Sequence, residues 1–473
     1  MIKKDLEHFI EAKCPFSVTE GQHEAVAMLA GFLLSSDRDA VGLLRGYAGT
    51  GKTSLLAALV RGLEGLRRRT VLLAPTGRAA KVFALHAGHP AFTIHKRIYR
   101  QKAFSGEMDN FSQNVNLMKH TLFIVDEASM IAAGNGVGFG TGRLLDDLVQ
   151  FVYSGEGCRL LLVGDAAQLP PVGEDESPAL SPDVLAGYGL HVWQAELTQV
   201  VRQQAESGIL WNATRLRQWI AGGEDLGWPK VRFTGFPDVR RLPGNELIEA
   251  LEEAYASCGA DQTIVVTRSN KRANLYNNGI RGRVLGREEE LTGGDRLMVA
   301  KNNYFWCHGE GEEGTFDFLA NGDMAEVKRV RRERELYGFR FADVSLRFPD
   351  YDDAELEATV LLDTLQSEAP ALTREQADCL FRAVEEDYAE VTVKRERMKK
   401  IKNDPYFNAL QVKYAYAVTC HKAQGGQWQR VFVDQGYVAE DMLGPDYFRW
   451  LYTAFTRATE TLYLVNWPAA QAE

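Results

Sequence analysis

The chain has 473 residues, a length that predicts about three domains. Of these residues 45% are hydrophobic and 25% charged, which is an ordinary globular composition. No apolar run approaches the ~18 residues that a membrane span needs, and the charged N-terminal segment lacks the apolar stretch of a secretion signal. The six cysteines lie far apart without metal-ligand spacing, which favours a reducing cytoplasm. The net charge of −10 by itself counts against nucleic acid as the partner.

The first two hundred residues repeat one pattern, in which an apolar run leads into a small polar or glycine-rich motif and then into a helical stretch. The four apolar runs are Ala40–Leu44, Thr70–Leu73, Thr121–Val125 and Leu160–Val163. Short apolar strands that alternate with helices predict a parallel sheet covered by helices. Ligands bind at the carboxyl ends of such strands, so we expect the four motifs to build one site.

A second α/β unit begins at Thr263–Val266 and is interrupted from about 301 to 409. Within the interruption, Val344–Phe348 alternates apolar and polar residues as a half-buried strand does. Further on, Thr373 and Gln376 form a capping box ahead of a helical pattern. We therefore predict a small β module with a helical arm, inserted into a second α/β domain.

The segment Gly46–Thr53, GYAGTGKT, fits the phosphate-binding pattern G-x-x-x-x-G-K-[ST] between a strand and a helix. Its glycines let backbone N–H groups point at a phosphate, Lys52 reaches the β- and γ-phosphates, and the Thr53 hydroxyl reaches Mg²⁺. A plain glycine-rich turn is the alternative, and the strand–loop–helix context disfavours it. The predicted nucleotide ligands in this segment are Gly46, Ala48, Gly49, Thr50, Gly51, Lys52, Thr53 and Ser54.

Asp126 and Glu127 follow the third apolar run. In phosphoryl transfer one carboxylate holds Mg²⁺ and a neighbouring polar group positions the attacking water; Asp126 suits the first role and Glu127 the second. Gln168, after the fourth run, is suited to bonding the γ-phosphate or that water. The alternatives are a solvated acidic turn and a loop stiffened by Pro170 and Pro171.

A γ-phosphate in transfer calls for a guanidinium, and such an arginine can be worth ~10³–10⁵ in rate. Arg202 in LTQVVRQ and Arg457 in AFTRA are the candidates. For any single arginine a surface position is the commoner role, and spacing alone does not separate the two.

Three segments that combine hydroxyls, loop amides and cations are suited to binding nucleic-acid phosphates without reading sequence. The alternatives are partly buried, hydrogen-bonded histidines and solvated lysines. The candidate DNA contacts are Thr76, Gly77, Arg78, His95, Lys96, Thr419, His421 and Lys422.

Taken in order, these segments resemble a superfamily 1 helicase, nearest to the RecD-like and Dda-like branch. The ten segments are TEGQ, GYAGTGKT, LLAPTGRAA, FTIHK, IVDEAS, LVGDAAQLPPVG, LTQVVRQ, VVTRSNKRANLYNNGIR, AYAVTCHKAQGGQ and LYTAFTRATETLYLV. The resemblance implies that Gln22 contacts adenine, and that Arg202 and Arg457 are arginine fingers. In motif V, Cys420 and Ala423 stand where relatives carry a small aliphatic residue and a serine, which puts one hydroxyl contact to the strand in doubt.

The resemblance also implies the fold class: α/β, with two RecA-like parallel-sheet P-loop domains and a small SH3-like β domain. The expected ranges are 1–205 for the first RecA-like domain, 206–300 with 410–473 for the second, and 301–409 for the SH3-like insertion with its acidic helical arm. A wedge insertion is expected at 97–118, with Phe104 or Phe111 as the stacking residue or as a local packing anchor.

The implied function is an ATP- and Mg²⁺-dependent DNA helicase or translocase that moves 5′→3′ on single-stranded DNA. Its expected partners are single-stranded and forked DNA and a single-strand-binding, replication or recombination protein, with no membrane; the chain itself is expected to be a cytoplasmic monomer. Two rivals remain open. One is a P-loop kinase of a small molecule, and the other is an ATP-gated clamp that binds DNA without unwinding it.

The net charge is unevenly distributed along the chain. Residues 350–390 hold thirteen acidic residues against two arginines, and the rest of the chain is close to neutral. A basic run follows at 394–402. The simple interpretation is a solvated helix and a solvated basic turn; the sharper hypothesis is that the basic run touches DNA while the acidic arm is held off it or meets a protein. The net charge therefore does not exclude nucleic acid.

Overall fold

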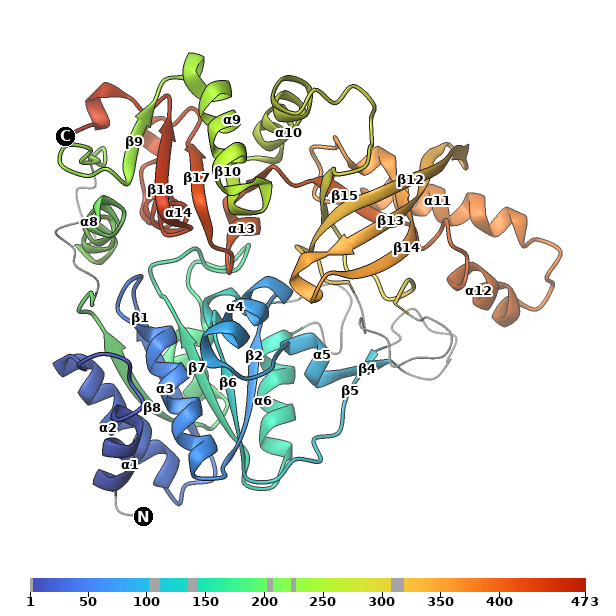
Figure 1. Cartoon of the computed structure of the whole chain (residues 1–473). Coiled ribbons are helices and arrows are strands. Elements are labelled where there is room, and N and C mark those ends of the chain that lie inside the picture. Colours follow the sequence, from blue (N-terminus) through green and yellow to red (C-terminus); the bar gives the residue numbers. More distant parts are fainter. Residues whose placement is uncertain (1–2, 102–110, 135–142, 202–206, 223–226, 308–318) are drawn as a thin grey trace.

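The computed structural model describes residues 3–101, 111–134, 143–201, 207–222, 227–307 and 319–473 (Figure 1). Its first domain is built on a six-stranded sheet in the order β3-β2-β6-β7-β1-β8, and the paired strands are all parallel. Its strands are β1 (Ala40–Gly46), β2 (Arg69–Ala74), β3 (Ala91–Thr93), β6 (Thr121–Val125), β7 (Arg159–Gly164) and β8 (His191–Leu197).

Helices cover both faces of this sheet because its strands are apolar on both sides. The helices are α1 (Lys3–Glu11), α2 (Glu20–Leu34), α3 (Lys52–Gly65), α4 (Gly77–Ala87), α5 (Ile94–Ile98), α6 (Leu144–Ser154) and α7 (Pro182–Gly187). Residues of α1, α2 and α3 form one core with the sheet, and residues of α5, α6 and α7 form the core on its other face.

A short antiparallel hairpin leaves the first domain between α5 and β6. Its strands are β4 (Tyr99–Gln101) and β5 (Phe111–Gln113), with Arg100 opposite Ser112. The hairpin lies inside the predicted wedge insertion at 97–118. Phe104 lies outside the described residues, as does the side chain of Phe111, so the choice of wedge residue stays a prediction.

The second domain has a five-stranded parallel sheet in the order β16-β10-β17-β18-β9 and lies above the first domain in Figure 1. Its strands are β9 (Val239–Leu242), β10 (Thr263–Thr267), β16 (Ala417–Thr419), β17 (Trp428–Asp434) and β18 (Ala458–Val465). Its helices are α8 (Gly208–Gly222), α9 (Leu247–Cys258), α10 (Asn270–Gly279), α13 (Cys420–Ala423) and α14 (Pro445–Phe455). The predicted pair of RecA-like α/β domains is therefore confirmed.

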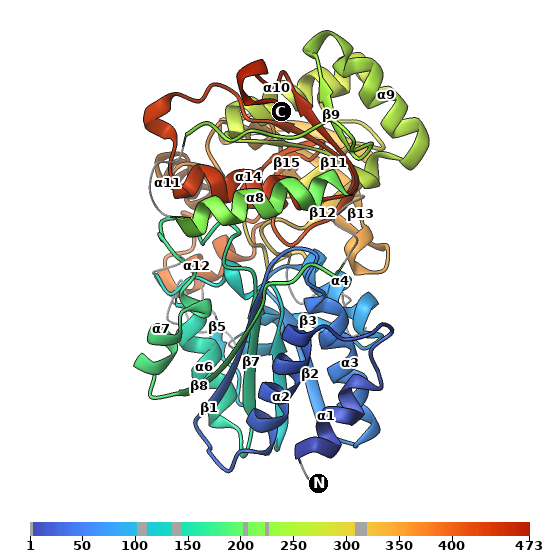
Figure 2. The ribbon, with the colours of Figure 1, turned by 90° about the vertical axis from the view of Figure 1, so that its left-hand side faces the viewer.

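Helix α8 follows the first sheet in sequence but packs on the second domain. Asp238, just before β9, accepts hydrogen bonds from the amides of Gly208 and Ile209 at 2.8 and 3.3 Å and so caps the N-terminus of α8. Further along, the rings of Trp219 and Phe448 meet edge to face at 5.5 Å. Figure 2 shows α8 and α14 side by side on the underside of the second domain, facing the first.

A closed barrel of five strands interrupts the second domain, as expected for the inserted SH3-like module. Its strands are β11 (Arg296–Val299), β12 (Met324–Leu336), β13 (Phe339–Phe348), β14 (Ala354–Leu361) and β15 (Leu410–Tyr414). The barrel therefore extends beyond the predicted range of 301–409 at both ends. The reason is that β11 and β15 are short apolar runs, which in sequence look like strands of the parallel sheet on either side.

The helical arm consists of α11 (Arg374–Asp387) and α12 (Lys394–Lys402), and the predicted capping box of Thr373 and Gln376 begins α11. Ile401 of α12 is fully buried in a core shared with the barrel residues Phe341 and Leu361. The arm is therefore packed onto the barrel, and most cations of α12 are exposed.

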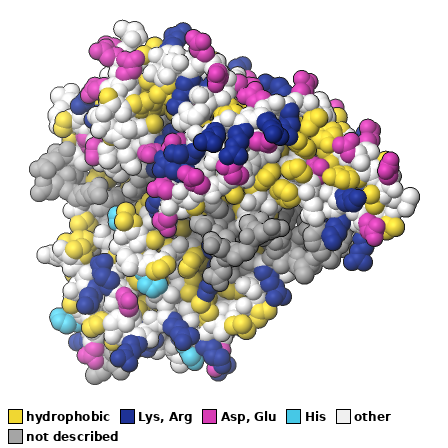
Figure 3. Space-filling view, turned by 45° about the vertical axis from the view of Figure 1, so that its right-hand side comes forward, with side chains coloured by type: hydrophobic (Ala, Val, Ile, Leu, Met, Phe, Trp, Pro, Cys, Tyr) yellow, Lys and Arg dark blue, Asp and Glu magenta, His cyan; other side chains and the backbone are white. Residues whose placement is uncertain are grey.

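The acidic stretch 350–390 is not one structural unit. Its first part lies on β14 and the neighbouring turns, where carboxylates pair with barrel arginines: Arg347 with Asp353 at 2.6 Å and Arg331 with Glu357 at 3.3 Å. Figure 3 shows a band of Lys and Arg side chains on this side of the molecule with Asp and Glu among them. Only the second part, from 374 onward, belongs to the arm. Among the described residues, no helix is long and apolar enough to cross a membrane.

Candidate nucleotide and nucleic-acid site

The loop between β1 and α3 has the conformation that the glycine pattern predicts. Gly49 and Gly51 have φ values of 77° and 83°, which a residue with a Cβ adopts only with strain. Lys52 folds back over the loop, and its Nζ donates to the carbonyl oxygens of Gly46 and Tyr47 at 2.6 and 2.9 Å. The ammonium therefore lies at the mouth of the loop, where a β- or γ-phosphate would compete for it. The other predicted ligands of this segment lie at the end of β1, in the loop or in the first turn of α3: Gly46, Ala48, Thr50, Thr53 and Ser54.

Gln22 is buried beside this loop, at 1% exposure. Its Oε1 accepts from the Thr19 amide at 3.0 Å in a capping box, and its Nε2 donates to the Thr50 carbonyl at 3.0 Å. The side chain therefore joins the start of α2 to the P-loop. An amide has two donors and two acceptor lone pairs, so these bonds leave capacity for an adenine edge, and that contact stays a prediction.

Asp126 and Glu127 lie where β6 ends. Burial and the neighbouring Glu127 carboxylate raise the pKa of Asp126 to about 7, and the charge of Lys52 opposes that rise. Glu127 has a φ of 52°, a left-handed backbone conformation that is strained in a residue with a Cβ. Among the described residues no three His, Cys, Asp or Glu side chains group as a metal site. The Thr53 hydroxyl and the Asp126 carboxylate are nevertheless the oxygen ligands that suit Mg²⁺ bound together with phosphates.

The segment after β7 supplies two further polar groups. Asp165 is 1% exposed, and its Oδ2 lies 3.9 Å from the Lys52 ammonium. Gln168 is 7% exposed, and its Oε1 is buried without a hydrogen-bond partner among the described residues. An unpaired buried amide oxygen costs free energy, so Gln168 is suited to bonding a ligand or a water molecule.

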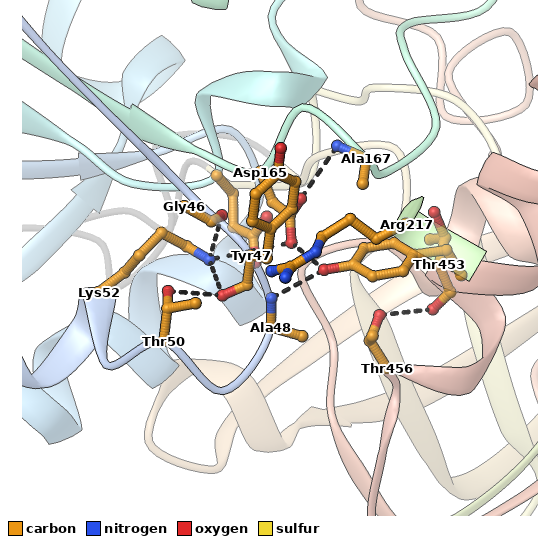
Figure 4. A network of polar contacts seen from close by, with 12 residues as sticks. Gly46, Tyr47, Ala48, Thr50, Lys52, Asp165, Ala167, Arg217, Thr453 and Thr456 are labelled. Atoms are coloured by element: carbon orange, nitrogen blue, oxygen red, sulfur yellow. Dashed lines mark hydrogen bonds and ion pairs between the residues drawn. The ribbon is translucent and has the colours of Figure 1, made fainter. Parts of the chain in front are cut away.

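Helix α14 of the second domain meets the first domain through polar contacts (Figure 4). The Tyr452 hydroxyl donates to Asp165 Oδ2 at 2.7 Å and accepts from the Ala48 amide of the P-loop at 2.7 Å. The next residue, Thr453, accepts through Oγ1 from the Leu169 amide at 2.9 Å. The two domains therefore meet on the P-loop and on the segment after β7.

Arg457, a predicted finger, lies close to this interface but bonds within its own domain. It is 3% exposed, and its guanidinium donates to the carbonyl oxygens of Thr453 and Gly426 at 3.0 Å each and to Thr456 Oγ1 at 3.2 Å. To reach a phosphate it would have to leave these partners. Arg202, the other predicted finger, lies outside the described residues.

The first and last predicted DNA-contacting segments come together across the two domains. Thr76 caps α4 by accepting from the Ala79 amide at 3.2 Å. Arg78 lies over the Trp428 ring at 4.1 Å and donates to the Gln427 carbonyl at 2.9 Å. A Cβ on Gly425 would lie 3.3 Å from Thr76 Oγ1. The start of α4 therefore touches the chain that follows α13.

The barrel touches both of these segments. A Cβ on Gly77 would lie 2.6 Å from the Tyr351 hydroxyl, which leaves room only for glycine. Lys422 hydrogen-bonds Asn321 of the barrel. Burial and the nearby Lys413 charge lower the pKa of Lys422 to about 8. Two of the predicted DNA contacts, Gly77 and Lys422, therefore lie against turns of the barrel.

The remaining predicted DNA residues differ in exposure. Burial lowers the pKa of His95 to about 4, so this side chain is neutral at pH 7 and lies 5.7 Å from the Tyr99 ring; Lys96 is exposed. Thr419 is half-buried and His421 exposed at the start of α13.

The two departures in motif V both point into the second domain. Cys420 and Ala423 are fully buried, and the Cys420 thiol donates to the Trp450 carbonyl at 3.6 Å. A hydroxyl at either position would face α14 rather than the molecular surface.

The sequence left several residues of this site without a role. Asp165 and Tyr452 stand inside recognised motifs, but their contact depends on how the two domains meet. Arg217 stands in no motif, yet its guanidinium lies over the ring of Tyr47 in the P-loop, 4.2 Å from its centre.

Comparison with known proteins matches two parts of the chain. Residues 17–223 match the model of an AAA domain, and residues 414–465 match that of a UvrD-like helicase C-terminal domain. Over 305 residues the chain is 28% identical to the ATP-dependent RecD2 DNA helicase of Deinococcus radiodurans, a stretch that covers 62% of this chain and 38% of that protein. It is 23% identical to the ATP-dependent DNA helicase Dda of Enterobacteria phage T4 over 66% of this chain and 67% of that one.

Among solved structures, the Pif1 helicase from Bacteroides in complex with ADP-AlF3 and ssDNA aligns over 96% of this chain and 93% of its own, with 16% identity and a TM-score of 0.46. Both family models fall on the segments that meet in the cleft, the P-loop domain and the domain of α14. These two models and the RecD2 and Dda relatives show that the chain is similar to superfamily 1 DNA helicases, in agreement with the resemblance of its motifs.

Proposed function

We propose that this chain is an ATP-dependent DNA helicase that hydrolyses ATP between its two RecA-like domains. The observation that carries the proposal is the bond network of Tyr452, which joins the P-loop amide of Ala48 and the Asp165 carboxylate to α14 of the second domain. A nucleotide that enters beside this network must alter contacts of both domains at once. Such a cleft couples nucleotide occupancy to domain movement, which is what a motor requires.

Each polar group of the cleft has a role in this chemistry. When ATP binds, the Lys52 ammonium gives up its hydrogen bonds to the carbonyl oxygens of Gly46 and Tyr47 and neutralises the charge of the phosphates instead. Thr53 and Asp126 would hold Mg²⁺, which supplies charge neutralisation at the phosphate oxygens. Glu127 orients the attacking water and takes its proton, and the free Oε1 of Gln168 accepts a bond from that water. Arg202 and Arg457 stay the proposed fingers.

For the DNA, we propose a path along α4 and α13, beneath the barrel. The contacts of Arg78 with Gln427 and of Lys422 with Asn321 join the two domains and the barrel along this line. As the nucleotide site opens and closes, α4 of the first domain and α13 of the second domain would bind the DNA strand in alternation. A base-pair step is worth ~1.4 kcal/mol, so one ATP per step is sufficient. The proposed direction, 5′→3′, rests on the resemblance to the RecD-like and Dda-like branch.

The proposed substrates are single-stranded DNA and forked duplex DNA. A single-strand-binding, replication or recombination protein is the proposed protein partner, and the motor is proposed to act as a monomer in the cytoplasm. This chain spans only part of the length of these relatives, 38% of RecD2 and 67% of Dda.

The test is unwinding of a forked duplex that carries a 5′ tail, a 3′ tail or both. We expect strand separation that needs ATP and a 5′ tail, and an ATPase rate that rises with single-stranded DNA. Unwinding from the 3′ tail alone would overturn the direction while the helicase activity stands.

Two other outcomes would favour the rivals. If single-stranded DNA does not change the ATPase rate and a small acceptor becomes phosphorylated, the chain is a kinase. The second parallel sheet and the contacts of α14 argue against this outcome, because a small-molecule kinase needs only one core domain and a lid. If ATP changes DNA affinity but no fork is separated, the chain is an ATP-gated clamp.

A further inference from the structure

Arg217 occupies an unexpected place for a residue of the second domain. It belongs to α8, which Asp238 caps and which packs on α14 through Trp219. Its side chain nevertheless crosses to the first domain, where its guanidinium lies over the Tyr47 ring at 4.2 Å and Nη1 donates to the Thr198 carbonyl at 3.1 Å. Figure 4 shows it beside Tyr47 and Ala48.

Tyr47 marks the phosphate end of the nucleotide site. The lysine of a P-loop reaches the β- and γ-phosphates, and here Lys52 Nζ lies 2.9 Å from the Tyr47 carbonyl oxygen. The Tyr47 hydroxyl is held on the far side by Glu196 at 2.9 Å. Arg217 therefore brings a positive charge from the second domain to the end of the loop where the terminal phosphate would lie.

The guanidinium also has donors to offer. An arginine carries five N–H donors, and among the described residues the bond to Thr198 uses one of them while the face stacks on Tyr47. The side chain is partly exposed. Arg457 contrasts with it, because that buried guanidinium already has three acceptors in its own domain.

We propose that Arg217 contacts the γ-phosphate of bound ATP and so reports its presence to α8 and the second domain. This inference rests on the proposed ATP site. On ATP binding the guanidinium moves from the Tyr47 ring to the phosphate oxygens, and α8 follows because its capped N-terminus and its contact with α14 fix it to the second domain. With ADP there is no γ-phosphate, and the side chain stays on Tyr47.

The test measures the affinity of a fluorescent non-hydrolysable ATP analogue and of fluorescent ADP for the full chain. Arg217→Gln removes the charge, Arg217→Lys keeps it, and Arg215→Ala is the control. Arg215 lies on the same helix but stacks on Trp211 at 4.9 Å and pairs with Glu473, away from the P-loop.

A hydrogen bond to a charged group is worth about 1.5–3 kcal/mol, so Arg217→Gln should weaken binding of the ATP analogue roughly 10- to 100-fold. Binding of ADP should change less than about twofold, and Arg217→Lys should recover part of the loss. Arg215→Ala should match the wild type for both nucleotides.

An equal loss for ATP analogue and ADP, or no loss for either, would overturn the proposal. An equal loss with a lowered melting temperature would mark Arg217 as a structural support of Tyr47. Failure of the wild-type chain to bind either nucleotide would instead overturn the proposed function, so the two failures are distinguishable.

Discussion

Tyr452 and Asp165 share a buried hydrogen bond of 2.7 Å across the interface of the two parallel-sheet domains. The same hydroxyl accepts from the P-loop, and burial together with the Asp165 charge raises the pKa of Tyr452 well above its usual range. The phenol therefore stays protonated and remains a donor to Asp165. A single hydroxyl thus links the nucleotide loop to the second domain.

Replacing Tyr452 with Phe should uncouple the two domains while the ring still fills its site. The loss of a buried hydroxyl should lower the free energy of unfolding by about 1–2 kcal/mol. The stimulation of the ATPase rate by single-stranded DNA should fall several-fold, and the KM for ATP should change little. Tyr447→Phe is the matched control, since that hydroxyl on the same helix bonds Gln435 within the second domain at 2.6 Å. Equal DNA stimulation in both variants would contradict the coupling role.

Lys52→Ala should abolish ATP hydrolysis, because the P-loop then has no ammonium to neutralise the phosphates. Binding of single-stranded DNA, measured by fluorescence anisotropy, should remain close to that of the wild type. Lys119→Ala removes an exposed lysine that pairs with Glu156 at the surface and should retain full activity. A wild-type rate of ATP hydrolysis in Lys52→Ala would contradict the assignment of Gly46–Thr53 as the ATP-binding loop.

Arg457→Ala should reduce turnover by ~10³-fold or more if the residue acts as a finger, with ATP affinity changed only a few-fold. Its three hydrogen bonds within the second domain also predict a loss of stability, so melting temperatures must be measured on the same samples. A change confined to ATP affinity would exclude Arg457 as a finger. Unchanged turnover with a lower melting temperature would make it a structural residue.

The Asp323 carboxyl predicts a pH dependence of stability. It is 3% exposed and accepts from the Tyr351 hydroxyl at 2.8 Å and the Ala320 amide at 2.7 Å, and burial raises its pKa to about 7. Between about pH 4 and pH 7 the folded protein keeps a proton that the unfolded chain releases, so stability should fall as pH rises through this window.

Urea unfolding at several pH values would measure this effect. Asp323→Asn keeps an acceptor but cannot titrate, so its stability should fall less than that of the wild type between pH 5 and pH 7. The difference between the two curves isolates Asp323 from the Asp126 carboxyl, whose pKa is raised in the same direction. Parallel curves would rule out Asp323 as the titrating group.

The basic helix α12 is expected to contact the DNA backbone. It lies on the same side of the molecule as the β4–β5 hairpin in Figures 1 and 2, and Lys394, Arg395 and Lys400 are exposed. Replacing these three with Ala should weaken binding to a forked duplex and reduce its salt dependence by up to about 0.9 per lost phosphate contact. The ATPase rate on single-stranded DNA should not change.

A matched control removes the same charge elsewhere on the inserted domain. Lys328, Arg329 and Arg332 are exposed on β12, and the triple alanine variant lowers the net charge equally. If both triple variants lose fork affinity to the same extent, the effect reports overall charge and not a contact of α12.

The sequence predicted best what depends on local pattern. The P-loop, its glycines and the ends of β6 and β7 follow from strand, turn and helix signals, and the capping box at Thr373 begins a helix as expected. The same holds for the two parallel sheets, since apolar runs that alternate with helices leave few other arrangements.

What could not be predicted depends on contacts between distant segments. The four-residue run of β11 is too short to reveal whether it joins a parallel sheet or a barrel. The predicted range 206–300 already placed α8 in the second domain, but local pattern did not reveal that its N-terminus is capped by Asp238, sixteen residues beyond the end of the helix. For the same reason the roles of Arg217 and Tyr452 depend on docking of one domain against the other, which no local spacing encodes.

The barrel has its entry and exit strands side by side, because β11 pairs with β15 and Leu297 lies opposite Tyr414. A module joined through neighbouring ends can be lengthened or exchanged without opening the sheet that hosts it. The α11–α12 arm is a second insertion of this kind. It lies between β14 and β15, two strands in which Val360 is paired with Leu410. The chain is therefore nested: the helical arm is inserted in the barrel and the barrel is inserted in the second domain, so residues can be added to the arm without changing the strand order of either parallel sheet.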